Sequence, residues 1–405
     1  MKILMGFHTL AYPPQSGVRR RTFHLLDETA KCNDVTIVSL GTRSDEASVR
    51  EYFRDTNVRI IFVDYGAPKW INLLKRIKMW MLQKSLLQIS VTREMQRTLD
   101  RIFRKEKFDL IFLSSPVLLY YKLPNSIPCV ADTHNVEYDL WYRSYQHAKS
   151  FPSRIYLRNQ YKLMKRDELE LCRQPDILLA TSERDKELFE QDLHEQTIRV
   201  IPNGVDISYF VPQEVQEIPH SMVFSGVMNY LPNENAMMYF LDKIFPLIQK
   251  SVPDTKIFIV GTSPSKKLKD RSNEHITVTG QVEDVRPYIA KAEVYVIPLL
   301  IGGGTRLKAL EASAMKKAIV STSLGCEGIN FRDGESVLLA DTPEAFSQAV
   351  IRLFDDRVYR VRLAEQAYST VASSYSWRAI GGRLNDVLKS AVQPKKGTMT
   401  YDDVL

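Results

Sequence analysis

A run of glycines followed by two cations is the part of this sequence best suited to do chemistry. In chain order its residues are Gly302, Gly303, Gly304, Thr305, Arg306 and Lys308. Glycine lets the backbone approach a ligand closely and turn its N–H groups toward it. The start of a helix adds unpaired N–H donors and a positive dipole end, which suit a phosphate. With the two cations, this pattern predicts a diphosphate site, and a tight turn with two solvated cations is the structural alternative.

Hydrophobic patterning places this run between a strand and a helix. Residues 294–297 are β-branched or aromatic, which is typical of a buried strand. Apolar residues recur at helical spacing from 307 to 315. The order strand, glycine loop, helix therefore favours the anion site over a plain turn.

Strands and helices alternate through most of the chain. Strands are predicted at residues 3–7, 35–40, 58–63, 110–114, 129–132, 177–181 and 198–201, then at 222–225, 256–260, 276–279, 294–297 and 318–321. Helices are predicted at 20–29, 154–171, 235–249 and 306–315. Such alternation is typical of α/β proteins with parallel, doubly wound sheets. The sequence therefore predicts two Rossmann-like domains, with a shared ligand between them at the carboxyl ends of the strands.

A pause in this pattern near residue 205 gives the domain boundary. A length of 405 residues fits two domains of about 200 residues each. We therefore expect a first domain at 1–205 and a second at 206–378. The polar residues 394–405 are expected to form a disordered tail.

Composition and charge describe an ordinary globular protein. The net charge of +7 fits an anionic small ligand or an anionic membrane surface as well as nucleic acid. No long basic tract interleaved with aromatic residues is evident, so nucleic acid is not expected as a partner.

Four scattered cysteines without CxxC spacing argue against zinc and a disulfide framework and favour a reducing cytosol. No apolar run approaches the roughly 20 residues of a spanning helix, so we expect a soluble or peripheral protein without a signal peptide.

One segment, residues 70–89, has the pattern of a basic amphipathic helix. Its apolar residues Trp70, Leu73, Leu74, Ile77 and Met81 recur at helical spacing near Lys75, Arg76, Lys78 and Lys84. A helix of this kind can lie on an anionic bilayer, while a core-packing helix with a solvated basic face is the alternative. Peripheral membrane contact through 70–89 is therefore one expectation. It would place the protein in the cytoplasm, at the inner face of the membrane.

Two groups of polar residues follow predicted strands of the first domain. His134 lies two residues after the strand at 129–132, where parallel-sheet enzymes carry their working groups. A lone histidine is, however, more often structural than catalytic. Gly17 leads into three arginines at 19–21, which predicts a second anion site, with solvated arginines as the alternative.

Two further candidates belong to the second domain. The turn at 225–233 contains Gly226 and Asn229 and precedes a predicted helix, so it is suited to contact a ligand. Glu311 lies in the helix that follows the glycine run. A carboxylate at this position accepts hydrogen bonds from vicinal hydroxyls such as those of a ribose, and an exposed helix glutamate is the alternative.

Together these motifs resemble the retaining GT-B glycosyltransferases of the group 1 (family 4-like) type, in the branch that makes bacterial surface polysaccharide. The resemblance spans about residues 1 to 390. It rests on Ser16-Gly17, on Asp132 with His134-Asn135, on Ile-Pro-Asn-Gly-Val-Asp at 201–206, on 225–233 and on 302–311. The segment at 374–377 resembles the lead-in to the family's last helix.

The resemblance implies a fold and an activity. The fold is GT-B, with an acceptor-side domain and a nucleotide-sugar-binding domain facing across a cleft, and a last helix at 379–393 that crosses back to the first domain. The activity is hexosyltransferase-like. It moves a sugar from a nucleotide diphosphate donor, of UDP or GDP type, to a glycan or lipid-linked acceptor. Retention of the anomeric configuration, no obligatory metal and a role in polysaccharide or glycolipid biosynthesis are also implied.

Carried over by position, the resemblance gives each candidate residue a role. Gly17 would approach the donor phosphates and His134 would face the transferred sugar. Arg306 and Lys308 would neutralise the leaving diphosphate, since preorganised cations stabilise such charge without metal. The remaining positions would hold the donor nucleotide, with Glu311 on the ribose and Val282 at the base, beside Gly226, Asn229, Gly303, Gly304 and Thr305.

The chain departs from the family pattern at two places. The family often has two glutamates separated by seven residues, and the first falls on Gly303 here. The usual Arg and Lys pair after the second domain's first strand is replaced by Asn229 and Tyr230. Arg306 and Lys308 are expected to substitute for that pair. The alternatives are a GT-B-shaped binding or scaffold protein without turnover, and a sugar nucleotide epimerase of the same fold.

Overall fold

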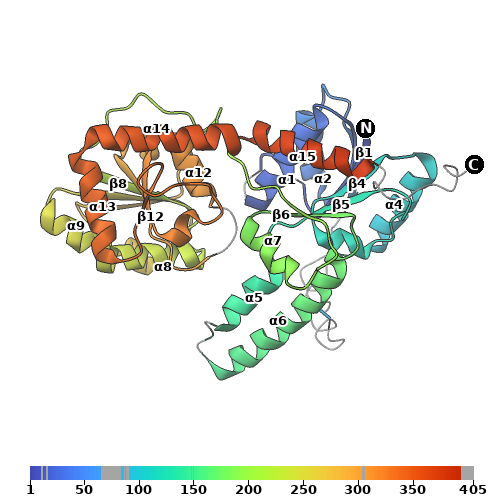
Figure 1. Ribbon diagram of the computed structural model, residues 1–405, viewed down its shortest axis with the longest axis horizontal. Coiled ribbons are helices and arrows are strands. Elements are labelled where there is room, and N and C mark those ends of the chain that lie inside the picture. Colours follow the sequence, from blue (N-terminus) through green and yellow to red (C-terminus); the bar gives the residue numbers. More distant parts are fainter. Residues whose placement is uncertain are drawn as a thin grey trace, which may run out of the picture. The chain divides into compact units, whose positions relative to one another are not determined.

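Two parallel β-sheets, each with its own helices, make up the structure (Figure 1). The computed structural model describes residues 1–10, 12–14, 17–64, 84–85, 87, 91–146, 148, 150–302 and 306–393. Contacts divide the chain into two units. The first is Met1–Ile201 together with the chain from Gly381 onward, and the second is Pro202–Ile380.

The sheet of the first unit has seven parallel strands in the order β3-β2-β1-β4-β5-β6-β7. They are β1 (Lys2–Phe7), β2 (Asp34–Gly41), β3 (Arg59–Asp64), β4 (Leu110–Leu113), β5 (Cys129–Asp132), β6 (Ile177–Ala180) and β7 (Ile198–Val200). The helices are α1 (Gly17–Ala30), α2 (Arg43–Tyr52), α4 (Arg93–Lys105), α5 (Glu137–Gln146), α6 (Phe151–Cys172) and α7 (Glu183–Glu190), with a 3₁₀ turn η2 (Pro116–Tyr120). The strand order reverses between β1 and β4, and ligands of such sheets bind at this switch point.

The sheet of the second unit has six parallel strands in the order β10-β9-β8-β11-β12-β13. They are β8 (Ser221–Ser225), β9 (Lys256–Val260), β10 (Ile276–Gly280), β11 (Val294–Ile297), β12 (Ala318–Ser321) and β13 (Leu338–Leu339). The helices are α8 (Leu231–Tyr239), α9 (Phe245–Ser251), α10 (Lys266–Lys269), α11 (Arg286–Lys291), α12 (Leu307–Ala314), α13 (Pro343–Asp355) and α14 (Arg357–Ser374), with turns η3 (Phe240–Ile244) and η4 (Ser323–Cys326). The prediction of two parallel-sheet α/β domains is confirmed.

Apolar side chains cover both faces of these sheets. In β8, Met222 and Phe224 belong to one hydrophobic cluster while Val223 between them belongs to another. Parallel strands buried in this way have nearly continuous apolar sequences. The predicted strands are all present, with ends that differ by a residue at most.

The helix predicted at 235–249 is interrupted. Its central part, η3, is a π-helical turn between α8 and α9. Pro246 lies at the start of α9 and has no N–H to continue the α-helical hydrogen bonds. The change of hydrogen-bonding register at η3 accommodates this proline, which hydrophobic spacing alone does not reveal.

The last helix, α15 (Trp377–Val392), begins in the second unit and continues in the first. Its Gly381 faces α1 so closely that a Cβ there would lie 2.3 Å from the side chain of Glu28. Nδ2 of Asn33, after α1, donates a hydrogen bond to Oδ1 of Asn385 at 3.0 Å. A glycine at 381 is therefore needed for α15 to pack on α1.

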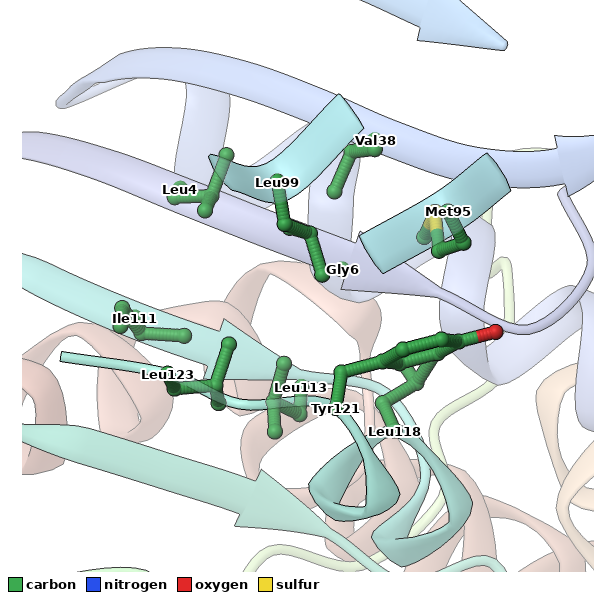
Figure 2. A pocket seen from close by; sticks show the side chains of 10 residues that line it. All are labelled: Leu4, Gly6, Val38, Met95, Leu99, Ile111, Leu113, Leu118, Tyr121 and Leu123. Atoms are coloured by element: carbon green, nitrogen blue, oxygen red, sulfur yellow. The ribbon is translucent and has the colours of Figure 1, made fainter. Parts of the chain in front are cut away.

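A small apolar cavity lies in the core of the first unit. Figure 2 shows side chains of β1, β2, β4 and α4 closing around it, among them Leu4, Val38 and Leu99. The cavity measures about 10 Å³, and its polar neighbour Tyr121 uses its hydroxyl to accept the Thr92 N–H at 3.0 Å. A space of this size without polar partners stays dry, so it belongs to the core.

Candidate functional site

Lys308, in the first turn of α12, reaches the turn that follows β8. Its Nζ donates a hydrogen bond to Oδ1 of Asn233 at 2.6 Å and lies 4.1 Å from the centre of the Phe224 ring. Gly226, directly after β8, is so close that a Cβ there would lie 3.5 Å from this Nζ. Three elements, β8, α8 and α12, therefore hold one amine against the carboxyl end of the sheet.

The backbone beside this amine is tightly packed. Gly226 has a φ of +157° and Gly261, after β9, a φ of +149°. A Cβ on Gly261 would lie 1.7 Å from the carbonyl oxygen of Gly226, and the Gly226 N–H donates to the Val260 carbonyl at 3.0 Å. Both glycines are needed for this close approach of two backbone segments, and the absence of a Cβ on Gly226 leaves room for the Lys308 amine beside it.

The buried position of Lys308 changes its protonation. Burial lowers the pKa of Lys308 to about 7, with Glu311 opposing this effect and Arg306 adding to it. The amine is therefore partly uncharged near neutral pH. An anion bound beside it would favour the protonated form and raise the pKa again.

Arg306 is fixed just before α12 by the turn that follows β12. Its side chain is 7% exposed, and its Nε donates to the Leu324 carbonyl at 2.9 Å. Its Nη2 lies 3.4 Å from Oε2 of Glu327. On the other side, a Cβ on Gly302 would come within 2.9 Å of Nη1. The guanidinium is therefore held in one place next to Gly302.

Of the other residues predicted to bind the donor nucleotide, Glu311, Asn229 and Val282 lie in described parts of the second unit. Glu311 is half-buried in α12, and its charge acts on Lys308 and on the buried Tyr295 of β11, whose hydroxyl is 2.6 Å from Oγ of Ser225. Asn229 is exposed in the turn after β8, and Val282 is half-buried after β10. Gly303, Gly304 and Thr305 lie outside the described residues, as does nearly all of the segment 70–89.

In the first unit, a pocket of about 110 Å³ lies at the carboxyl ends of β1, β4 and β5. Its lining mixes imidazole, hydroxyl and apolar groups, contributed by His8, Thr9, Val18, Thr22, Ser114, Ser115, Val117 and His134. Burial lowers the pKa of both His8 and His134, so the neutral rings are favoured. Neutral imidazoles and hydroxyls both donate and accept hydrogen bonds, which suits a hydroxyl-rich ligand. Gly17, the first residue of α1, is exposed next to Val18.

A buried ion pair lies behind His134. Nε and Nη2 of Arg21 donate to the two carboxylate oxygens of Asp132 at 2.8 and 2.6 Å, and both side chains are 1% exposed. Oδ2 of Asp132 lies 3.6 Å from Nδ1 of His134. We expected the arginines at 19–21 to bind an anion or to be solvated. This is wrong for Arg21, because its guanidinium is buried and forms an ion pair with Asp132.

The described residues include neither a metal-ligand cluster nor a spanning helix. Across the described ranges, no three His, Cys, Asp or Glu side chains are grouped to hold a metal ion. No helix in that part of the chain is both long and apolar enough to cross a bilayer. The four cysteines are free, and burial raises the pKa of Cys326, near Arg306, to about 12.

Two family models match the two units. Residues 15–209 match the model described as Glycosyltransferase Family 4, and residues 219–356 match Glycosyl transferases group 1.

Individual proteins also resemble this chain. A relative from Klebsiella pneumoniae, described as an uncharacterized 44.6 kDa protein in the cps region, is 25% identical over 40% of this chain and 44% of that protein. The UDP-Gal:alpha-D-GlcNAc-diphosphoundecaprenol alpha-1,3-galactosyltransferase of Escherichia coli is 25% identical over 87% of this chain and 89% of its own length. HepE of Anabaena, solved in complex with UDP, superimposes with a TM-score of 0.65 at 13% identity, over 96% of this chain and 100% of that one. This chain therefore belongs to the group 1 glycosyltransferases and has their GT-B fold.

Proposed function

We propose that this protein transfers a hexose-type sugar from a UDP or GDP sugar to a glycan or lipid-linked acceptor, with retention of the anomeric configuration. The observation that carries the proposal is the position of two basic side chains at the start of α12. Lys308 lies beside the backbone of Gly226 after β8, and Arg306 lies beside Gly302. Cleavage of the sugar–diphosphate bond builds negative charge on the leaving group. Cations already held in place stabilise that charge without reorganisation and without an obligatory metal.

The position of Lys308 supports the expectation that it takes the place of the two cations that the family usually has after β8. The turn after β8 carries Asn229 and Tyr230 where the family usually has Arg and Lys. Lys308 reaches this turn from α12 and is held there by Asn233 and Phe224. In the proposal it supplies, from another element, the positive charge that the turn lacks.

The other site residues have subsidiary roles in this proposal. Gly17 and the backbone at Gly226, Gly303, Gly304 and Thr305 would approach the donor phosphates, with Asn229 nearby. Glu311 would hold the ribose, and Val282 would lie at the base. His134, on the hydroxyl-lined pocket of the first unit, would face the transferred sugar. The acceptor class draws on the E. coli relative, whose name contains diphosphoundecaprenol, and supports a place in polysaccharide or glycolipid biosynthesis.

A donor panel tests the proposal. UDP-glucose, UDP-galactose, UDP-N-acetylglucosamine and GDP-mannose would each be incubated with the protein, with and without a polyprenol-diphosphate sugar acceptor. We expect release of UDP or GDP from at least one donor, accelerated by the acceptor, and an α-linked product from an α-linked donor. Binding of UDP or GDP without any release would instead indicate a scaffold protein. Conversion of the donor sugar to its epimer would indicate an epimerase.

Replacing Glu311 with glutamine should weaken donor binding about 10- to 150-fold, because hydrogen bonds from the ribose to a charged carboxylate are worth about 1.5–3 kcal/mol. Calorimetry with UDP, and with its 2′-deoxy form, measures this loss. If Glu311 holds the ribose hydroxyls, the variant and the 2′-deoxy ligand should lose affinity non-additively. The matched control is Glu365→Gln on α14, a half-exposed glutamate paired with Lys316, which should bind as the wild type does. Fully additive losses would assign Glu311 another role.

A further inference from the structure

The hairpin formed by α5 and α6 exposes apolar side chains where the two helices join. Figure 1 shows the helices side by side, extending away from the strands of their unit. Near the joint, Phe151 is 77% exposed, Ile155 56%, Tyr156 45% and Tyr142 38%. Large apolar side chains grouped in this way mark an interaction site. We call residues 142–146 of α5 and 151–162 of α6 the hairpin tip.

The same segment is strongly basic. Residues 140–166 contain no Asp or Glu but seven basic residues, namely Arg143, Lys149, Arg154, Arg158, Lys162, Lys165 and Arg166. They also contain six aromatic residues, namely Trp141, Tyr142, Tyr145, Phe151, Tyr156 and Tyr161. The expectation that the chain has no basic tract interleaved with aromatic residues is therefore wrong for this segment.

Apolar and basic side chains share one face of α6. Phe151, Ile155, Arg158 and Lys162 follow each other at spacings of four, three and four residues, which places them on one side of a helix. Arg158 and Lys162 are exposed and, like Arg154, form no ion pair with any described residue. Arg143, Lys165 and Arg166 are paired with Asp139, Asp192 and Asp167. The unpaired cations are thus the ones beside Phe151 and Ile155.

The base of the hairpin is anchored in the first unit. The buried carboxylate of Glu168, on α6, accepts the N–H groups of Glu137 and Tyr138 at 3.0 and 2.8 Å and so caps the start of α5. The Tyr138 hydroxyl donates to the Leu188 carbonyl at 2.9 Å. A fixed base holds the exposed tip in a defined position, which a docking surface requires.

We propose that the hairpin tip docks this protein on an anionic lipid bilayer. Phe151 and Ile155 would enter the boundary between headgroups and acyl chains, while Arg154, Arg158 and Lys162 contact lipid phosphates. Aromatic side chains are favoured at the same depth. A nucleic acid would use the cations but offers nothing to the aliphatic Ile155, so the bilayer fits the tip better. This docking does not depend on the proposed sugar transfer.

Vesicle co-sedimentation of the full-length protein, without donor or acceptor, tests the proposal. The vesicles would contain either phosphatidylglycerol with phosphatidylethanolamine or phosphatidylcholine alone. The wild type is expected to bind the anionic vesicles and to release as salt rises. Arg154→Gln/Arg158→Gln/Lys162→Gln should lower the partition coefficient about 100-fold at low salt, because each cation contributes about fivefold. Phe151→Ser/Ile155→Ser should lower binding at all salt concentrations.

Two control variants separate this surface from others. Lys266→Gln/Lys267→Gln/Lys269→Gln removes the same charge from exposed positions on α10 in the second unit and should bind like the wild type. A Lys75, Arg76, Lys78 and Lys84 to glutamine variant tests the segment 70–89. Loss of binding in that variant alone would overturn the proposal, as would equal binding by all variants. Binding of single-stranded RNA but of no vesicle would also overturn it. Thermal melting verifies that each variant is folded.

Discussion

Replacing Arg21 with methionine is expected to lower the free energy of unfolding by about 3–5 kcal/mol. The Arg21 guanidinium makes two hydrogen bonds to Asp132, and neither side chain is accessible to solvent. Methionine fills much of the space of arginine but leaves the carboxylate buried without a counter-charge. Urea titration followed by circular dichroism measures the change.

Two further variants isolate the buried pair from a general effect of losing an arginine. Arg54→Met removes an arginine that is 67% exposed and paired with Glu51, and it should cost less than about 1 kcal/mol. The double variant Arg21→Met/Asp132→Leu removes both charges and should recover most of the loss. If Arg21→Met is as stable as Arg54→Met, the ion pair does not stabilise the first unit.

The Arg21–Asp132 pair also matters for the pocket in front of it. Asp132 presents Oδ2 at 3.6 Å from Nδ1 of His134, and this nitrogen forms no hydrogen bond to any described residue. By fixing the carboxylate, Arg21 fixes the charge beside the imidazole. Arg21 is therefore a positioning residue, which acts on His134 through Asp132.

The fold was predictable because of how parallel sheets are buried. Strands covered on both faces give short apolar runs bounded by polar turns, and these runs identified nearly every strand. β13 is the exception, since Leu338–Leu339 is too short to form a pattern. Hydrophobic spacing also missed the π-helical turn η3, because the change there concerns the hydrogen-bonding register and not which side chains are apolar.

The site was predictable only where its residues are close in sequence. The glycine run with Arg306 and Lys308 lies within one short motif. The partner of Lys308, Asn233, comes 75 residues earlier, and Arg21 and Asp132 are 111 residues apart. Arg21 differs from Arg19 and Arg20 in being buried, and nothing in the local sequence pattern indicates this difference. His8, which lines the same pocket, was missed although the rule that found His134 applies to it, because it too follows a predicted strand.

The largest effect on function is expected at α12, where Lys308→Ala and Arg306→Ala should each weaken nucleotide-diphosphate binding and reduce turnover. Each change removes a charge-assisted contact from a desolvated site, worth about 1.5–3 kcal/mol, or roughly 10- to 150-fold. Isothermal titration calorimetry with UDP and GDP measures the affinity, and nucleotide release measures turnover. Unchanged affinity for both nucleotides in both variants would remove these residues from the site.

The pH dependence distinguishes Lys308 from Arg306. Burial lowers the pKa of Lys308 to about 7, so at pH 8 the free protein carries mostly a neutral amine there. A bound diphosphate raises this pKa, and binding must then take up a proton. Affinity should therefore fall as pH rises above about 7, and the binding heat should depend on the buffer's ionisation enthalpy. Lys308→Arg keeps the charge at every accessible pH and should lose both effects. Proton uptake that persists in Lys308→Arg would show that another group titrates.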